Sequence, residues 1–449
     1  MKIRTQTQAQ GGSALIVTLL TAVVIGITLA SYLTLVSSQN VSTMRSLAWN
    51  STVPVLEAGV EEALTQIHYT GITNLSANGW TYTVGGLYQK QRSLVGGSSY
   101  TVVIQPVDPP VIESVGYVPV PLTPSSQLGM ILGGLISPGQ SSIYVNRQVR
   151  VNTKGLPRWD KAMAADGQID QVGNNIQTDS FLSCDPAYST NGRYDPAKAR
   201  DNGDIATNSG LVNSVNVGNA DVKGHVSTGP GGSVNIGPQG AVGSKSWVES
   251  GNKGVQTGYV SDDMNVEFPD VEIPFTSGYL TPGGGTVDGV NYNYIMGGNG
   301  TKYKLGSFSG KVLVTGNVSL YVTSSFNFTG QDAITIAPGA SLKVYVGATT
   351  ASLGGNGVIN NTGNALNFQY YGLPSNTSLS LSGNAAFTGA IYAPDAAFTL
   401  GGGGNNTYDF VGGSVTKTVT MNGHFNFHFD ECLRRGPVLQ YVVTAWNEI

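Results

Sequence analysis

An uncharged apolar run near the N-terminus constrains the fold of this chain more than any other feature. Residues 14–36, ALIVTLLTAVVIGITLASYLTLV, are roughly 23 positions without a charge, long enough for a helix to cross a bilayer. Lys2 and Arg4 precede the run, and Arg45 is the first cation after it. The positive-inside rule therefore predicts a single-pass membrane protein whose N-terminus is cytoplasmic and whose bulk lies outside the cytoplasm.

Two other interpretations of this run are open. A buried core helix fits it less well, because a soluble domain has no need of so long an uncharged helix. A cleaved secretory signal is the stronger alternative, with Val36-Ser37-Ser38 as its cleavage site. The run nevertheless exceeds the usual apolar region of such signals, which is about 7–15 residues.

The composition indicates an exported β protein. Only 11% of the residues are charged, and 61 of the 449 are Gly. Amides and hydroxyls must therefore solvate the surface, and 40% hydrophobic residues are enough to build a core. The net charge of -4 and the lack of a basic patch argue against nucleic acid as a partner.

Changes in residue pattern divide the chain into six segments. We expect a basic leader at 1–12, a transmembrane helix at 13–38, a helix with a small β-sheet at 39–154, a linker or cap at 155–203, a β-solenoid at 204–433 and a C-terminal cap or tail at 434–449. The predicted fold class is mainly β: an N-terminal transmembrane α-helix, a small α+β head and a C-terminal parallel β-solenoid of the right-handed β-helix type.

The apolar helix is predicted to continue into the small head. LEAGVEEALTQI places one face at helical spacing and the acidic residues on the other side, with Pro54 as a candidate kink; the apolar face is Leu56, Val60, Leu64 and Ile67, and the acidic residues are Glu57, Glu61 and Glu62. Short alternating strands follow, at Trp80–Val84, Tyr100–Gln105, Val111–Val118 and Ser142–Val151. A sheet packed on the helix would let both elements bury their apolar faces.

Short apolar strands separated by Gly and Asn turns fill residues 205–429. Val312-Leu313-Val314, Ile334-Thr335-Ile336 and Leu379-Ser380-Leu381 are examples, and most alternate inward and outward. This pattern favours a parallel β-solenoid; a β-sandwich is the alternative, but it would need longer strands and clearer hairpins. Residues 266–303 look like a non-repetitive insertion, and the apolar tail 437–449 is expected to cap the last turn or to form an edge strand.

The two cysteines, Cys184 and Cys432, lie far apart and outside any CxxC spacing, so metal binding and thioredoxin-like chemistry are poorly supported. Two alternatives are open. In an oxidising exterior the pair would form a disulfide that ties the C-terminal region to the body. Otherwise they are two separate buried thiols.

No catalytic, cofactor or metal site is expected. Asp262-Asp263 is the only adjacent carboxylate pair in the repeats and fits a solvated turn, and no arginine lies between Arg200 and Arg434. His424 and His428 would be roughly 13 Å apart along one extended strand, too far to share an ion. Acidic residues 195–204 lack the spacing of a calcium loop. A polysaccharide-degrading β-helix enzyme is therefore the least favoured reading.

The N-terminal motifs carry a resemblance to a known family. GGSALIVTLLTAVVIGITLA followed by LEAGVEEALTQI resembles the N-terminal segment of PilX-type pilus-assembly proteins and related minor pilins and pseudopilins, over residues 1–70. The resemblance implies prepilin-peptidase cleavage after Gly12, with Ser13 as the new N-terminus. It also implies a bacterial cytoplasmic membrane location, or an extracellular pilus after processing, and other pilin-like subunits, pilus or secretion assembly proteins and membrane lipid as partners.

One position departs from the major-pilin pattern. Those proteins have Glu at the fifth mature position, where it meets the N-terminal amine of a neighbouring subunit, and here that position is Val17. An uncharged residue removes an intramembrane ion-pair partner. This favours a tip, initiating or merely anchored subunit over ordinary filament polymerisation.

Two later regions look like the uncharacterised Gly-rich β-repeat regions that follow such N-termini in some environmental bacteria: residues 178–210 and GAIYAPDAAFTLGGGG through DECL. That group has no assigned activity. The expected function is a non-enzymatic, exported minor-pilin-like subunit of a type IV pilus or type II secretion-like assembly. The alternative is a membrane-anchored adhesin or carbohydrate-binding solenoid, for which Tyr292, Tyr294, Tyr370 and Tyr371 are candidate sugar-stacking residues unless they pack in the core.

Overall fold

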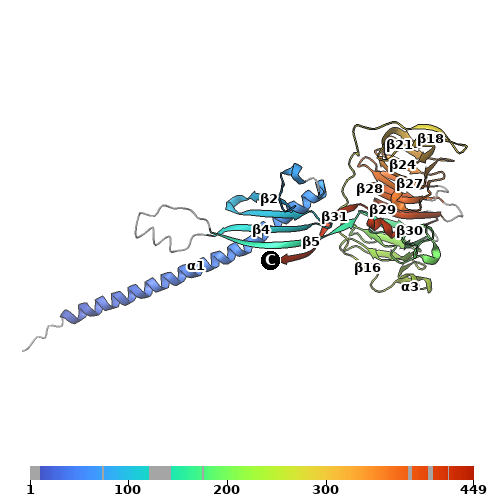
Figure 1. The fold of residues 1–449 in the computed structure, drawn as a ribbon. Helices are drawn as coiled ribbons and strands as arrows, with labels where there is room; N and C mark the ends of the chain where they lie inside the picture. Colours follow the sequence, from blue (N-terminus) through green and yellow to red (C-terminus); the bar gives the residue numbers. More distant parts are fainter. Residues whose placement is uncertain are drawn as a thin grey trace, which may run out of the picture. The chain divides into compact units, whose positions relative to one another are not determined.

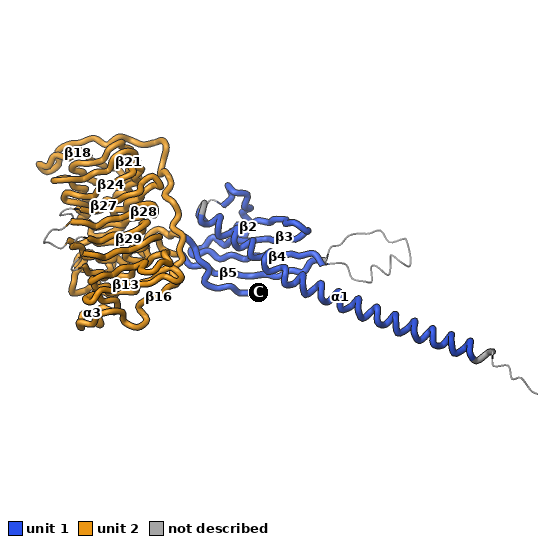
Figure 2. The backbone as a smooth tube through the Cα atoms, turned by 180° about the vertical axis from the view of Figure 1, so that it is seen from behind, with its two compact units in different colours: residues 1–155, 440–449 blue, residues 156–439 orange. Residues whose placement is uncertain are grey.

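The computed structural model describes residues 11–72, 75–120, 143–173, 176–382, 387–402, 408–422 and 424–449. The chain is mainly β, with one long apolar helix at its N-terminal end. It divides into two compact units (Figure 2): unit 1 comprises residues 1–155 and 440–449, and unit 2 comprises residues 156–439. Unit 1 is therefore built from both ends of the chain, with unit 2 inserted between them.

Unit 1 combines one helix with a six-stranded sheet. Its elements are α1 (Gly11–Thr70), η1 (Leu75–Asn78), β1 (Thr81–Tyr82), β2 (Tyr88–Ser93), η2 (Val95–Gly97), β3 (Ser99–Gln105), β4 (Val111–Val120), β5 (Ile143–Pro157) and β31 (Val438–Glu448). The strands are ordered β1-β2-β3-β4-β5-β31, and the first five pair antiparallel. The sequence missed β2, whose residues YQKQRS lack an apolar alternation.

The two halves of α1 have different surroundings, as Figure 1 shows. Its N-terminal half extends past the sheet, and the large apolar side chains from Leu15 to Leu35 are exposed. This is the one helix in the described part of the chain that is long and apolar enough to cross a membrane. The helix continues through the candidate kink at Pro54 without a break in its assignment.

The C-terminal half of α1 packs on the sheet. Leu56, Val60 and Ile67 are buried as predicted, in one cluster with Val102 and Ile112 of the sheet. The contact between helix and sheet is close: a Cβ at Gly116 of β4 would lie 2.8 Å from the carbonyl oxygen of Thr52. The Ser114 hydroxyl donates to the carbonyl oxygen of Leu56 at 2.8 Å, so β4 is fastened to the helix by polar contacts as well as by apolar packing.

Glu62 of α1 is a partner of the sheet rather than a solvated residue. Its carboxylate accepts hydrogen bonds from Arg92 Nε at 2.7 Å and from the Tyr100 hydroxyl at 2.6 Å, and Lys90 Nζ lies 3.0 Å away. Burial opposes the charged form, but these bonds and the Lys90 charge outweigh it and lower the pKa of Glu62 to about 2. The acidic side of the helix therefore also contributes to the join with β2 and β3.

The C-terminal tail completes the sheet of unit 1. β31 lies beside β5, where the backbone N–H of Ile449 donates to the carbonyl of Gln148 and the Thr444 hydroxyl donates to the carbonyl of Asn152. The sequence offered a cap of the last turn or an edge strand, and the structure shows an edge strand. Its position in the first unit was not foreseen, because a tail of this kind carries no signal for its partner.

Unit 2 is a stack of short strands. Its elements are β6 (Met163–Ala165), β7 (Ile169–Gln171), β8 (Gln177–Phe181), η3 (Pro196–Lys198), β9 (Ile205–Thr207), β10 (Val215–Gly218), β11 (Asp221–Lys223), β12 (Val226–Ser227), β13 (Val234–Ile236), β14 (Ala241–Gly243), α3 (Lys245–Glu249), β15 (Gly254–Val255), β16 (Val260–Ser261), β17 (Gly283–Val287), β18 (Val290–Met296), β19 (Lys302–Phe308), β20 (Lys311–Val314), β21 (Asn317–Phe328), β22 (Ala333–Ile336), β23 (Ser341–Val346), β24 (Thr350–Leu353), β25 (Val358–Asn360), η4 (Ala365–Asn367), β26 (Phe368–Gly372), β27 (Ser378–Leu381), β28 (Phe387–Leu400), β29 (Tyr408–Met421), β30 (Phe425–Asp430) and η5 (Glu431–Arg435).

Most strand pairs in this stack are parallel. β22 pairs with β25, β23 with β26 and β24 with β27, each in parallel, and the same pattern recurs through the unit. Alternate side chains are buried, as in β23, where Leu342, Val344 and Val346 face the core. Parallel pairing excludes the antiparallel β-sandwich considered from the sequence.

The layers do not stack in the order of the sequence. β29 pairs in parallel with β6 and β7, and β30 pairs with β8, so the last layer of the chain lies on the first. We call this contact between β6–β8 and β29–β30 the seam. The chain enters unit 2 near Arg158 and leaves near Pro437, and the backbone N–H of Arg158 donates to the carbonyl of Pro437 at 3.0 Å. Because both ends of the inserted unit meet, its first and last layers must be neighbours.

An irregular segment, residues 262–282, connects the two ends of the stack, and we call it the strap. It contacts widely spaced layers: Val266 N–H donates to Asn208, the Tyr392 hydroxyl donates to the carbonyl of Pro269, and Phe275 packs edge-on against Tyr321. The strap can be followed in Figure 1 between β16 and β18. Residues 266–303 were predicted as a non-repetitive insertion, which fits the strap but not β17 and β18, since these form a hairpin and β18 pairs with β20.

Residues 155–203, expected to be a linker or cap, contain β6–β8 in the middle of the stack. Their density of Asp and Arg suggested a solvated connector. In the structure these side chains serve contacts between layers, with Asp179 fully buried and Arg200 paired with Glu431. Charge in this region therefore reflects tertiary pairing, which the sequence pattern does not reveal.

Candidate functional site: the disulfide and polar network of the seam

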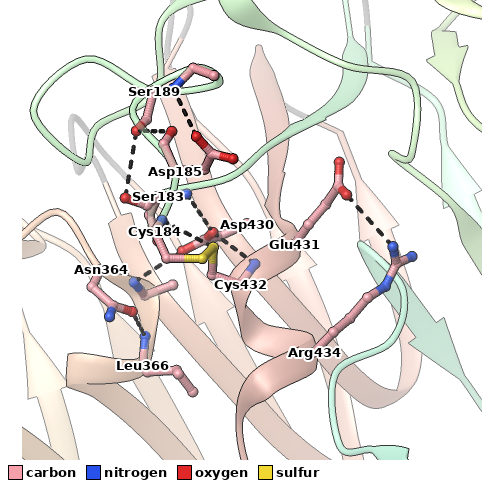
Figure 3. Close-up of a disulfide and its surroundings, with 12 residues drawn as sticks. Ser183, Cys184, Asp185, Ser189, Asn364, Leu366, Asp430, Glu431, Cys432 and Arg434 are labelled. Atoms are coloured by element: carbon pink, nitrogen blue, oxygen red, sulfur yellow. Dashed lines mark hydrogen bonds and ion pairs between the residues drawn. A yellow bond between two sulfur atoms is a disulfide. The ribbon is translucent and has the colours of Figure 1, made fainter.

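A disulfide crosses the seam. Cys184 follows β8 and Cys432 lies in η5, 248 residues later in the sequence, with Cα atoms 6.0 Å apart (Figure 3). The sequence left two alternatives for these cysteines, and the structure contains the bonded one. The bond joins the first layer of unit 2 covalently to the end of its last layer.

Asp430 supports the disulfide from within. One of its carboxylate oxygens accepts hydrogen bonds from the backbone N–H groups of Ser183 and Cys432, each at 3.1 Å. The residue is fully buried, and this burial raises the pKa of the Asp430 carboxyl despite the hydrogen bonds. It also caps the N-terminal end of η5, so one side chain orients both cysteine-bearing segments.

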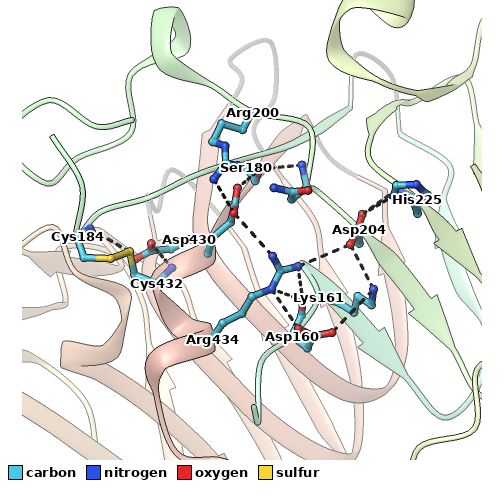
Figure 4. A network of polar contacts seen from close by, with 12 residues as sticks. Asp160, Lys161, Ser180, Cys184, Arg200, Asp204, His225, Asp430, Cys432 and Arg434 are labelled. Atoms are coloured by element: carbon cyan, nitrogen blue, oxygen red, sulfur yellow. Dashed lines mark hydrogen bonds and ion pairs between the residues drawn. A yellow bond between two sulfur atoms is a disulfide. The ribbon is translucent and has the colours of Figure 1, made fainter. Parts of the chain in front are cut away.

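Two residues of η5 extend the network toward the first layers (Figure 4). Glu431 accepts a hydrogen bond from the Ser180 hydroxyl and pairs with Arg200, both at 2.8 Å. Arg434 donates to the carbonyl oxygen of Asp160 at 2.8 Å and lies 3.7 Å from the Asp204 carboxylate. Contacts of this kind fix the last turn of the unit against its first.

His428 occupies a second polar cluster at the seam. Its Nδ1 lies 2.6 Å from Asp179 and its Nε2 lies 3.3 Å from Asp409, while the Tyr194 ring stacks on it with centroids 3.6 Å apart. Burial favours the neutral imidazole, but the bonds and charges of Asp179 and Asp409 outweigh it and raise the pKa of His428. The Asp179 carboxylate also accepts hydrogen bonds from the Tyr194 hydroxyl and the Gln177 side-chain amide, so three side chains contact it.

The side chains of these clusters hold the first and last layers of unit 2 together. Asp430, Glu431, Arg434 and His428 each bond to groups of the first layers, and no serine, threonine or cysteine side chain lies against the imidazole in the described contacts. Within the described ranges, no three His, Cys, Asp or Glu side chains are arranged to hold a metal ion. The network stabilises the parallel pairing of strands that the sequence places farthest apart.

The structure separates the other sequence candidates. Gly12 and Ser13, the predicted processing site, lie in the first turn of α1, and the leader residues 1–10 lie outside the described residues. Asp262 and Asp263 are exposed at the start of the strap, as expected of a solvated turn. His424 precedes β30 and does not share the surroundings of His428.

The candidate sugar-stacking tyrosines divide into two pairs. Tyr370 and Tyr371 are buried, so the suggestion that they are exposed is wrong and the core alternative is correct for them. Tyr370 faces the core beside Phe326, and Tyr371 stacks on Tyr345 with ring centroids 4.9 Å apart. Tyr292 and Tyr294, in contrast, are partly exposed on β18.

The sequence missed most residues of the seam. From the sequence, Asp179 was one of several charged residues of a polar segment, and Asp430 and Glu431 were considered only as neighbours of His424 and His428 at a disfavoured metal site; none of the three was expected to be buried at a contact between layers. One signal was available: HFNFHFDEC places two histidines and two carboxylates close to one of only two cysteines. That density of polar residues within an apolar strand indicates groups that require partners when buried.

Comparisons with known proteins assign only part of the chain. Residues 309–435 match a family described as a domain of unknown function, DUF7305, and this range runs from just before β20 to η5. No curated protein matches the chain. Among solved structures, it is similar to the competence-associated pilin ComZ from Thermus thermophilus, with a TM-score of 0.27 and 10% identity over 90% of this chain and 98% of that one. A TM-score this low carries no argument about fold, so the comparisons leave 309–435 as a stretch similar to a family without an assigned activity.

Proposed function

We propose that this chain is an exported structural subunit of the minor-pilin or pseudopilin type, and not an enzyme. The observation that carries the proposal is the division of α1 into two halves. Its first half is apolar and exposed from Leu15 to Leu35, whereas its second half is packed on an antiparallel sheet through Leu56, Val60 and Ile67. The first half of such a helix can insert into lipid while its second half remains packed on the sheet of unit 1.

The exposed half of α1 needs a nonaqueous partner. Burying a large aliphatic side chain stabilises by about 1.5–3 kcal/mol, so a whole exposed row is strongly driven into lipid or against other apolar helices. The partners we propose are membrane lipid and other pilin-like subunits or assembly proteins, with the N-terminus in the cytoplasm of a bacterium. Val17 at the fifth mature position supports a tip, initiating or anchored role.

We further infer that unit 2 is a parallel β-solenoid carried outside the cytoplasm. Repeated parallel pairing, alternate burial and a continuous core through the layers support this architecture. The disulfide between Cys184 and Cys432 supports an oxidising location, since such bonds persist outside the cytoplasm. In this proposal the solenoid is a rigid body displayed on a membrane-anchored pilin-like head.

The test is mass spectrometry of the N-terminal peptide, taken separately from sheared surface material and from membranes. We expect a chain that begins at Ser13, with a methylated amine, in both fractions. An intact Met1 confined to membranes would overturn the pilin-like pathway. A new terminus near Ser38 would instead identify a secretory signal.

A pair of adjacent glycines provides a matched control. Gly12→Leu should block processing and leave Met1 in place, because the peptidase would meet a bulky residue at the scissile bond. Gly11→Leu changes the neighbouring position by the same volume and should be processed normally. Equal processing of both variants would contradict cleavage after Gly12.

A further inference from the structure

We propose that one open face of unit 2 binds an extended, neutral polysaccharide along the direction in which the layers stack. This face is formed by a row of polar side chains, one from each of eight successive layers, and we call it the hydroxyl–amide row. Its members are Asn327, Ser352, Ser380, Thr399, Thr420, Asp170, Asn216 and Asn235. The row is not interrupted at the seam.

Strand register places these residues directly beside one another. Ser380 pairs with Thr399 and Thr399 with Thr420, and then Thr420 pairs with Asp170 across the seam. Neighbouring strands lie about 4.8 Å apart, so the seven steps of the row span roughly 34 Å. That length and regular spacing suit a polymer with a repeating unit better than a single small ligand.

The side chains of the row face away from the core. In β27 the flanking Leu379 and Leu381 are buried while Ser380 is partly exposed, and in β29 the same holds for Thr420 between Val419 and Met421. A second row of small residues runs parallel to the first on four of these layers: Thr350, Ser378, Ala397 and Thr418. On these four layers the two rows place only small side chains on the outward face.

The row has unused hydrogen-bonding capacity. Within the described chain, the hydroxyls of Ser352, Thr399 and Thr420 have no hydrogen-bond partner. Farther along, Asn235 donates to Asn216 at 2.9 Å and Asn216 donates to Asp170 at 2.7 Å, which orders these groups and leaves other lone pairs and N–H groups free. The surface thus offers both donors and acceptors at regular intervals.

Charge and residue type favour a sugar polymer as the occupant. Asp170 is the only charged member of the row, so the face is not suited to an anionic polymer or to phosphates. Amide and carboxylate groups beside hydroxyls match vicinal sugar hydroxyls, which donate and accept at once. Single hydrogen bonds of this kind contribute little in water, but many along a rigid chain add by multivalency.

A row of tyrosines is the alternative sugar-binding surface of unit 2, but the strap contacts it. Tyr321, Tyr345, Tyr371 and Tyr392 form a ladder on another set of strands. The strap contacts this ladder through Phe275 on Tyr321 and through Pro269, which accepts from the Tyr392 hydroxyl. Among the contacts of the described residues, none joins the strap to the hydroxyl–amide row, so this row is the face that we propose for a partner.

The test is co-sedimentation of the full chain in detergent with insoluble cellulose and insoluble chitin, with a soluble neutral β-glucan as competitor. We expect retention on at least one of these polymers and release by the competitor. Thr399→Val with Thr420→Val keeps the branched shape of both side chains and removes two hydroxyls. It should weaken retention about tenfold.

Thr335→Val is the matched control, because Thr335 is a partly exposed outward residue of β22 on a different set of strands. It should bind as the unaltered chain does. Retention that survives the double variant, or that the control also loses, would overturn the assignment to this face. Retention on none of the polymers would also overturn it. So would a protein that binds no polymer but inhibits ice growth through this face. The proposed face does not depend on N-terminal processing, so the two tests fail or succeed separately.

Discussion

Both units of this protein are closed by a segment from the far end of the chain, but they are closed by different means. In unit 1, β31 adds to the edge of an antiparallel sheet, with Arg147 and Glu448 paired at the surface. In unit 2, the last layer pairs in parallel with the first, and the contact is held by a disulfide, a buried Asp430 and a buried His428. The stronger closure is that of unit 2, where the strands that pair come from the beginning and the end of the unit's sequence.

The physical reason is the cost of the loop that each contact closes. When two strands that are distant in sequence pair, the chain between them loses conformational entropy. The contacts between the strands must offset this cost. In unit 1 the buried strand residues of the core come from β3, β4 and β5, and β31 adds only the partly buried Tyr441 to it. In unit 2 the middle of the stack does not exist until β29 and β30 lie on β6–β8, so that contact requires its own reinforcement.

Removal of the disulfide should produce the largest effect. Cys184→Ser with Cys432→Ser frees a loop of 248 residues, and we expect unfolding of unit 2 to become easier by about 3–5 kcal/mol. Denaturant unfolding of the full chain in detergent measures this change. As a control, reductant should shift the unfolding midpoint of the unaltered protein to that of the double variant and leave the double variant unchanged. Equal unfolding midpoints of the two proteins without reductant would show that the seam does not need the disulfide.

Truncation of the helix face should weaken unit 1 and leave the seam intact. Leu56→Ala removes a buried side chain between α1 and the sheet, at an expected cost of about 2–5 kcal/mol. Hydrogen exchange followed by mass spectrometry can locate the loss, which should appear in β3 and β4. Leu47→Ala, at an exposed position of the same helix, is the control. Faster exchange in β29 and β30 would mean that the two closures are not independent.

A change of pH should act on the seam through His428. Its pKa is raised in the folded protein, so its stabilising contribution is complete below about pH 6.5 and is lost as the pH rises through the folded-state pKa. His428→Gln keeps a donor but cannot titrate, and at pH 5 it should cost about 1–3 kcal/mol. Unfolding midpoints from pH 5 to pH 9 should converge for the two proteins. A constant difference across that range would rule out the charged imidazole as the cause.

The surface pair of unit 1 should have the smallest effect. Glu448→Gln removes one charge of the pair with Arg147, and Glu448 is well exposed. Exposed pairs gain little because water screens them, so we expect no measurable shift of the unfolding midpoint. Gln440→Ala, a partly exposed residue of the same strand, serves as reference. A shift comparable with that of Leu56→Ala would show that β31 is held by charge rather than by the sheet.

Local pattern was enough to predict the elements that have a clear apolar periodicity. The apolar run, the helical face at Leu56, Val60 and Ile67, and the alternating strands of unit 2 are all present, because periodicity reports which side of an element is buried. Elements without alternation were missed, such as β2. Elements with charge were misread, such as β6–β8, because a buried ion pair and a solvated loop have similar composition.

The sequence alone determined the apolar N-terminal helix and the mainly β character, since both follow from residues close together in the chain. Tertiary structure alone decided that β31 joins the first unit, that the last layer of the second unit lies on its first, and that Cys184 meets Cys432 there. It also decided which polar residues form a continuous row and which tyrosines are buried. These outcomes depend on register between strands hundreds of residues apart, and no local pattern encodes the free energy of that pairing.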